Sequence, residues 1–247
     1  MSAVLLLHGQ PGDARDWDRV LDALGRDPEV LAFDRPGWDG QSRATDLEGN
    51  AAAAIGALDA RGIARAVVVG HSFGGAVAAW LAVHHPERIA ALILAAPSAN
   101  GRALYALDRV LASRAAGAAV VAGAGAALSL SPVRRAIAVR AQLDEPYLRG
   151  LARLLTKRSS WEAFVVEQRA LLDGIPQLEP QLARISAPTV IVAGAADRIV
   201  PTAAAELLSQ QIRGAELVLL RRAGHLLPHR HADKLAEIIT ARVRSSS

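Results

Sequence analysis

The chain has 247 residues, 51% of them hydrophobic, which is enough for one α/β domain with a substantial core. Its net charge of +4 comes almost wholly from arginines scattered along the sequence, so no basic stripe is present and no nucleic-acid partner is expected. The lack of cysteine excludes disulfides, thiolate metal sites and a cysteine nucleophile.

Two apolar segments bear on where the protein works. Residues 1–7 lack the basic n-region and the length of a signal peptide, which favours a cytoplasmic protein. Residues 115–133 carry no charge, but they are mainly alanine, glycine and serine, whose transfer into lipid gains little free energy. We therefore predict a buried or half-buried helix pair in this segment and no stable membrane insertion.

Short runs rich in valine, isoleucine and leucine alternate with longer helical patterns, which is typical of βαβ units around a parallel sheet. The predicted strands cover residues 4–7, 30–33, 66–69, 89–94, 189–193 and 216–219. The predicted helices cover residues 17–24, 46–61, 75–84, 202–210 and 232–243. The predicted fold class is α/β, with a mostly parallel central sheet of about six strands flanked by helices.

The alternation stops between residues 100 and 184, where the pattern is helical throughout. The helices predicted there cover residues 102–127, 132–143, 146–157 and 161–172. We interpret residues 1–99 and 185–247 as a core and residues 100–184 as a helical cap, or lid, inserted into it. Such a cap would lie over the carboxyl ends of the strands, where open α/β sheets place their ligands.

A serine flanked by glycines stands between a predicted strand and a predicted helix, in the sequence Gly70-His71-Ser72-Phe73-Gly74-Gly75. A chain that turns this tightly leaves room only for small neighbours, which explains the glycines on both sides of Ser72. The turn presents the hydroxyl group, and free N–H groups at the start of the helix face it. The pattern predicts Ser72 as a nucleophile, with a structural serine in a turn as the alternative.

A serine nucleophile needs a base, and the base needs a carboxylate that orients it. Among the seven histidines, His225 is the one that follows the last predicted strand. Asp197 follows the strand at 189–193 and is the predicted acid, with a helix cap as its alternative role. His71 is expected to point away from the site. The histidines expected as solvated surface groups near helix ends are His84, His85, His229 and His231.

The tetrahedral intermediate of a serine hydrolase requires N–H donors for its oxyanion. The backbone N–H of Phe73, the residue after the nucleophile, is the first predicted donor. The loop after the first strand contains Gln10 followed by Pro11, and proline has no N–H, so the N–H of Gln10 is the second predicted donor. The Gln10 side chain either enters the site or points to solvent.

These motifs together resemble the α/β-hydrolase fold family, especially its capped serine esterase, haloperoxidase-like and carbon-carbon hydrolase branches. The resemblance covers almost the whole chain outside the cap and rests on His8 through Gly12, Asp34 through Ser42, Gly70 through Gly75, the Asp197 loop and Gly224-His225. It implies the family's order of nucleophile, acid and histidine, with no cofactor and no metal. A serine nucleophile also argues against the dehalogenases and epoxide hydrolases of this fold, which use aspartate.

Two features depart from the family pattern. The first strand starts almost at Met1, so the usual N-terminal hairpin is missing, and an exposed sheet edge is expected that a homodimer would cover. The turn from Gly37 to Ser42 is one residue longer than usual, which puts Trp38 either toward the pocket or beneath the cap.

A small-molecule substrate is expected, and apolar side chains favour a small or medium uncharged acyl group. The predicted pocket residues are Trp38, Trp161, Phe164 and Leu226, with Phe73 and Leu227 as further apolar candidates. Core packing is the alternative for each cap aromatic. No dedicated carboxylate clamp stands out, although Arg35 or an arginine of the cap is a candidate for one.

The main functional hypothesis from the sequence is a carboxylesterase that forms an acyl-enzyme on Ser72. The first alternative is a hydrolase or lyase that cleaves a carbon-carbon bond beside a ketone with the same three residues. The second alternative is a non-catalytic binding protein on this fold, which the predicted activated serine disfavours because a binding module has no use for one.

Overall fold

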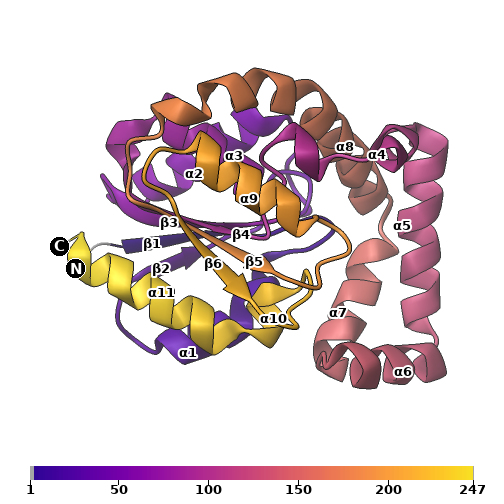
Figure 1. Cartoon of the computed structure of the whole chain (residues 1–247). Helices are drawn as coiled ribbons and strands as arrows, with labels where there is room; N and C mark the ends of the chain where they lie inside the picture. The colour runs from indigo at the N-terminus through magenta and orange to yellow at the C-terminus, as the bar shows by residue number, and fades with distance from the viewer. Residues whose placement is uncertain (1–2, 247) are drawn as a thin grey trace.

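The computed structural model describes residues 3–246 and contains a six-stranded parallel sheet with helices on both faces (Figure 1). The strand order is β2-β1-β3-β4-β5-β6, so β2 and β6 form the two edges. The strands are β1 Ala3–Leu7, β2 Val30–Ala32, β3 Ala66–His71, β4 Ile89–Ala95, β5 Thr189–Gly194 and β6 Glu216–Leu220. The predicted sheet of about six strands is confirmed.

The strands were recognisable because most of them are covered on both faces. Every residue of β1, β3, β4 and β5 is buried, which requires the near-continuous apolar runs seen in the sequence. Alternate side chains point to opposite faces, so Leu5 and Leu7 belong to one apolar cluster and Val4 and Leu6 to the other.

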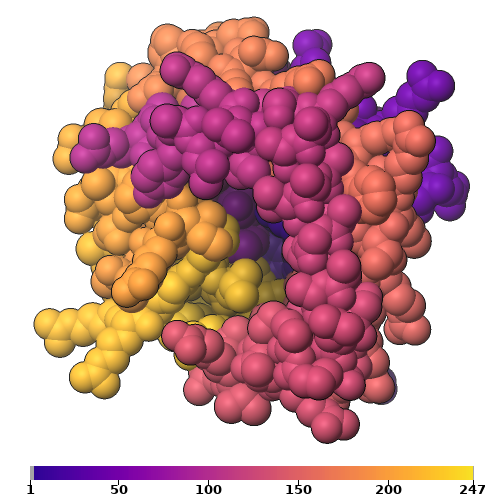
Figure 2. Space-filling view, turned by 90° about the vertical axis from the view of Figure 1, so that its right-hand side faces the viewer, coloured from indigo at the N-terminus to yellow at the C-terminus, as the bar shows by residue number. Residues whose placement is uncertain are grey.

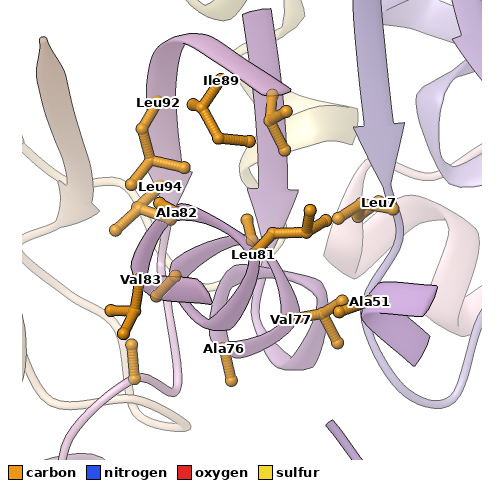
Figure 3. Packing of buried hydrophobic residues seen from close by; sticks show 14 of the residues in the cluster. Leu7, Ala51, Ala76, Val77, Leu81, Ala82, Val83, Ile89, Leu92 and Leu94 are labelled. Carbon is orange, nitrogen blue, oxygen red and sulfur yellow. The ribbon is translucent and has the colours of Figure 1, made fainter. Parts of the chain in front are cut away.

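The two faces are covered by different helices (Figure 1). One face packs against α2 Leu47–Asp59, α3 Phe73–His84 and α9 Thr202–Gln211, and the other against α1 Asp18–Leu24 and α11 Ala232–Ser245. On the first face, Leu81 of α3 lies toward Leu7 of β1, and Val77 lies toward Ala51 of α2 (Figure 3). The short helices of the core are η1 Ala14–Trp17, η2 Pro86–Arg88 and α10 Leu227–Arg230.

The segment between β4 and β5 is helical, and its middle part stands beyond the ends at which the strands finish (Figure 1). Its elements are η3 Gly101–Ala103, α4 Ala106–Leu111, α5 Arg114–Ser129, α6 Ser131–Ala141, α7 Glu145–Leu155, α8 Arg158–Leu178 and η4 Glu179–Arg184. A third apolar cluster, which includes Leu128, Leu148 and Phe164, holds these helices together. The second half of α8 packs instead in the cluster of α2 and α3, through Ala170, Leu171 and Ile175.

The continuous helix predicted over residues 102–127 is wrong. The chain forms η3 and α4, breaks at Ala112 and Ser113, and starts α5 at Arg114. The Ser113 hydroxyl accepts a hydrogen bond from the N–H of Ala116 at 3.2 Å, so this serine caps the new helix instead of continuing the old one.

The uncharged segment at 115–133 forms α5 and the start of α6. Within residues 3–246 no single helix is long and apolar enough to span a membrane, whereas α5 and α6 pass that test only as a pair bent by 97°. In α5 the buried side is Gly117, Val121, Gly125 and Leu128. The helix is therefore half-buried, as predicted.

Candidate functional site

Ser72 occupies the turn between β3 and α3, in a conformation with φ 53° and ψ −117°. A Cβ on Gly70 would come within 2.2 Å of the Gly74 carbonyl oxygen, and a Cβ on Gly74 within 2.3 Å of the Leu7 carbonyl oxygen. Both contacts are with backbone atoms that cannot move aside. The glycines are thus required by the close approach of β1, β3 and α3 around Ser72.

Asp197 and His225 meet in a hydrogen bond of 2.8 Å between Asp197 Oδ2 and His225 Nδ1. The other carboxylate oxygen of Asp197 accepts the N–H groups of Ile199 at 2.8 Å and Val200 at 3.0 Å, which fixes the side chain after β5. Because an ionised carboxylate only accepts, His225 Nδ1 carries the proton and Nε2 is left as the basic nitrogen.

His71 connects the serine turn to the His225 loop. Its Nε2 donates to the His225 carbonyl oxygen at 3.0 Å, and the two imidazole rings lie 4.9 Å apart between centroids. This contact differs from the expectation that His71 points away. Ser72 is thereby brought next to the His225 loop, but within residues 3–246 its hydroxyl makes no hydrogen bond to another protein group.

The loop after β1 lies against the serine turn. A Cβ on Gly9 would be 3.1 Å from Ser72 Cβ and 3.0 Å from His71 Nδ1, so the backbone of this loop approaches the nucleophile closely. Among the hydrogen bonds of residues 3–246, none uses the N–H of Gln10 or of Phe73. Gln10 Oε1 is buried and also has no partner within that part of the chain. Two backbone donors are thus unoccupied beside Ser72.

Arg35 does not bind a substrate carboxylate, which was its candidate role from the sequence. Its side chain is fully buried and forms an ion pair with Glu167 of α8. It also donates to the carbonyl oxygens of His8 at 3.0 Å and Gly9 at 2.9 Å, and lies 4.6 Å above the Phe73 ring. The guanidinium therefore holds the loop that carries Gln10 in place, and none of its N–H groups is left to bind a ligand.

Glu167 was missed in the sequence. It is fully buried, and burial raises the pKa of its carboxyl group although Arg35 opposes this shift. Its position in the sequence gives only a weak signal, because an acidic residue in a helix that mixes polar and apolar residues, such as α8, is usually exposed to solvent.

Two buried histidines make the stability of the folded protein depend on pH. Burial is the main cause that lowers the pKa of His8 and of His71 well below the ordinary value, with Arg35 adding to it at His8 and His225 at His71. The unfolded chain binds a proton on each of them near pH 6.5, whereas the folded chain does not. Their contribution to stability is complete above that pH and is lost as the pH falls below it.

The variant His71→Gln should have a shallower dependence of unfolding free energy on pH. Its amide can still donate to the His225 carbonyl oxygen, but it does not titrate. Between about pH 6 and pH 5 the slope should decrease by roughly 1.4 kcal/mol per pH unit relative to wild type. Urea unfolding at several pH values measures this slope, and identical slopes for both proteins would show that His71 is protonated in the fold.

A second polar cluster ties α7 to the core beside the site. The Tyr147 hydroxyl donates to Asp16 Oδ1 at 2.8 Å, and His229 Nε2 lies 3.8 Å from the same oxygen. The Tyr147 and His229 rings are 4.4 Å apart, and His229 is buried, so its predicted exposure is wrong. Burial raises the pKa of Asp16. The cluster joins α7, η1 and α10, and α10 begins two residues after His225.

Replacement of Tyr147 by phenylalanine should lower the unfolding free energy by about 1–3 kcal/mol, because the buried Asp16 carboxylate loses a donor. Urea unfolding at neutral pH measures the change. Tyr105, which is 48% exposed, provides the matched control, and Tyr105→Phe should have almost no effect. Equal losses in both variants would mean that the Tyr147 hydroxyl contributes nothing specific.

The predicted pocket residues lie mostly in the third apolar cluster. Trp38 and Phe164 are buried in it, Trp161 and Leu226 pack against it, and Trp161 Nε1 donates to the Leu155 carbonyl oxygen at 2.6 Å. Phe73 and Leu227, by contrast, are fully buried in the two core clusters and cannot line an open pocket.

The molecule is hollowed on the side where α4, α5 and α6 stand (Figure 2). Purple, indigo and yellow atoms, from the N-terminal and C-terminal parts of the chain, are visible in the hollow between the magenta helices and the orange core. No group of three or more histidine, aspartate and glutamate side chains that could hold a metal ion occurs within residues 3–246.

Comparison with known proteins adds to this geometry. The family model described as "Alpha/beta hydrolase family" matches residues 4–238. The 2-hydroxy-6-oxononadienedioate/2-hydroxy-6-oxononatrienedioate hydrolase 1 of Dechloromonas aromatica is 26% identical over 97% of this chain and 86% of its own length. The 2-hydroxymuconate semialdehyde hydrolase of Pseudomonas sp. is 26% identical over 96% and 84%. A solved hydrolase structure from Pseudomonas aeruginosa has a TM-score of 0.72 and 27% identity, covering 99% of this chain and 89% of that one.

Proposed function

Because the chain belongs to the alpha/beta hydrolase family, we propose that it is a serine hydrolase that cleaves a carbon-carbon bond beside a ketone. The observation that carries this proposal is the likeness of nearly the whole chain to relatives named as hydrolases of 2-hydroxy-6-oxo acids. This reverses the order of the two enzymatic hypotheses drawn from the sequence, in which a carboxylesterase came first.

In the proposed reaction the Ser72 hydroxyl attacks the ketone carbon while His225 Nε2 takes its proton. Asp197, 2.8 Å from Nδ1, stabilises the positive imidazolium that results. The N–H groups of Gln10 and Phe73 would bind the oxyanion, which is supported by their lack of other partners within residues 3–246.

The intermediate collapses with cleavage of the carbon-carbon bond. The acyl group stays on Ser72 Oγ, and the electron pair leaves with the other fragment, which His225 protonates. Such a carbanion can leave only if it is conjugated with a second carbonyl group, and a 2-hydroxy-6-oxo dienoate meets this requirement once it is in its keto form. Water activated by His225 then hydrolyses the acyl-enzyme and restores the free serine.

Carboxylesterase activity is the second candidate. The same steps operate with an alcohol as leaving group, and the Gly70-His71-Ser72 sequence mildly favours an esterase. The engagement of Arg35 with Glu167 also removes one candidate cation for a substrate carboxylate, which is consistent with an uncharged ester.

The experiment compares wild type with Ser72→Ala in three assays: labelling by a fluorophosphonate probe, turnover of a 2-hydroxy-6-oxo dienoate, and turnover of p-nitrophenyl esters of graded chain length. We expect labelling of wild type alone and a higher kcat/KM for the dienoate than for every ester. Turnover of esters alone would establish the second candidate. Labelling of Ser72→Ala would refute Ser72 as the nucleophile.

A further inference from the structure

Most of the large apolar side chains that are exposed belong to α4, α5, α6 and the residues that join them. Eight such side chains are exposed within residues 3–246, and six of them lie between residues 105 and 139. Isolated exposed apolar residues are normal, but a concentration in one part of a surface indicates an interaction site. Five of the six, together with the arginines named below, define what we call the α4–α6 surface: Leu107, Val110, Val120, Leu130 and Val139.

The charges of the same surface are mostly positive. The acidic residue of α4 is Asp108, whose carboxylate accepts the Tyr105 N–H at 2.6 Å. Residues 109–143 contain no aspartate or glutamate, and they include five arginines. Arg134 is turned inward and pairs with Glu145, whereas the other four are exposed. Within residues 3–246 these four form no ion pair and no side-chain hydrogen bond; they are Arg109, Arg114, Arg135 and Arg140.

We propose that the α4–α6 surface docks on an anionic phospholipid bilayer. Apolar side chains enter the boundary between headgroups and acyl chains, and arginines beside them bind the lipid phosphates. A nucleic acid would meet the arginines but leave Leu107, Leu130 and Val139 in contact with its polar backbone. A second copy of this chain would bring the same positive charge against itself, which disfavours self-association through this surface.

The hollow described above opens on the side from which α4, α5 and α6 are seen (Figure 2). A protein docked by these helices would therefore have its opening close to the bilayer. The docking does not depend on the reaction catalysed, because it uses none of the residues at Ser72, Asp197 or His225.

The test measures co-sedimentation of the whole protein with vesicles of phosphatidylcholine, either alone or with about 30 mol % phosphatidylglycerol. We expect binding to the mixed vesicles only, and weaker binding at high salt. Arg135→Gln/Arg140→Gln should lower the partition coefficient roughly 30-fold, since each arginine near an anionic surface contributes about fivefold. Leu107→Ser/Val139→Ser should lower it several-fold without changing the charge.

The matched control is Arg61→Gln. Arg61 is exposed and lies between α2 and β3, at the end of the sheet where the strands begin. This variant should bind the mixed vesicles within about twofold of wild type. Failure of wild type to bind them, or an equal loss for Arg61→Gln, would overturn the proposal. Sedimentation showing a dimer that Arg135→Gln/Arg140→Gln dissociates would instead assign the surface to a second copy.

Discussion

Replacement of Asp197 by asparagine should lower kcat about 10⁴-fold, whichever of the two proposed substrates is used. Asp197 Oδ2 accepts the Nδ1 proton of His225 at 2.8 Å, while Oδ1 is occupied by the Ile199 and Val200 N–H groups. Asparagine can keep its oxygen on the two N–H groups and then presents an NH₂ group to Nδ1. The imidazole must carry its proton on Nε2 instead, where it can no longer accept one from Ser72.

The measurement is kcat and KM together with urea unfolding, so that a lost function is not confused with a lost fold. Asp46→Asn is the matched control. Asp46 Oδ1 accepts the Gly49 N–H at 2.8 Å at the start of α2, and within residues 3–246 the Asp46 carboxylate forms no hydrogen bond with a histidine. Asparagine caps a helix as well as aspartate does, so this variant should behave as wild type. A loss below about tenfold in Asp197→Asn would mean that another group orients His225.

The sheet could be predicted because its physical requirement is local. A strand buried on both faces must be apolar along almost its whole length, and β3, β4 and β5 meet this requirement apart from His71 and Thr189 at strand ends. The serine turn is partly local, because Gly70 closely approaches the backbone of Gly74, four residues later, and this excludes a side chain at Gly70. The requirement at Gly74 comes instead from the Leu7 backbone of β1. Asp197 and His225 could be placed because each follows a strand, and parallel strands end at one edge of the sheet.

The buried polar contacts could not be predicted, because each of them joins residues that are far apart in the chain. Arg35 and Glu167 are separated by 132 positions, and Asp16 and Tyr147 by 131. One sequence shows neither which face of α8 is turned inward nor which loop it meets. The same limit applies to the break before α5, since a serine within an alanine-rich stretch fits a helix interior as well as its cap.

Glu167→Gln should lower the unfolding free energy by about 3–5 kcal/mol. Glutamine fills the same space but carries no charge, so the fully buried guanidinium of Arg35 is left without its counter-charge. The exposed Arg158 and Glu162 pair in the same helix provides the control, because Glu162→Gln should cost only about 0.3–0.5 kcal/mol. Urea unfolding of both variants at neutral pH measures the difference.

The same substitution tests whether the buried pair serves the site as well as the fold. Arg35 holds the carbonyl oxygens of His8 and Gly9, and a guanidinium that shifts to find another acceptor would carry this loop and the Gln10 N–H with it. Under conditions where Glu167→Gln remains folded, kcat should therefore fall more than KM rises, because an oxyanion donor acts mainly in the transition state. Unchanged kcat in the folded variant would confine the role of Arg35 and Glu167 to stability and leave the loop positioned by its packing against Ser72 and Gly74 alone.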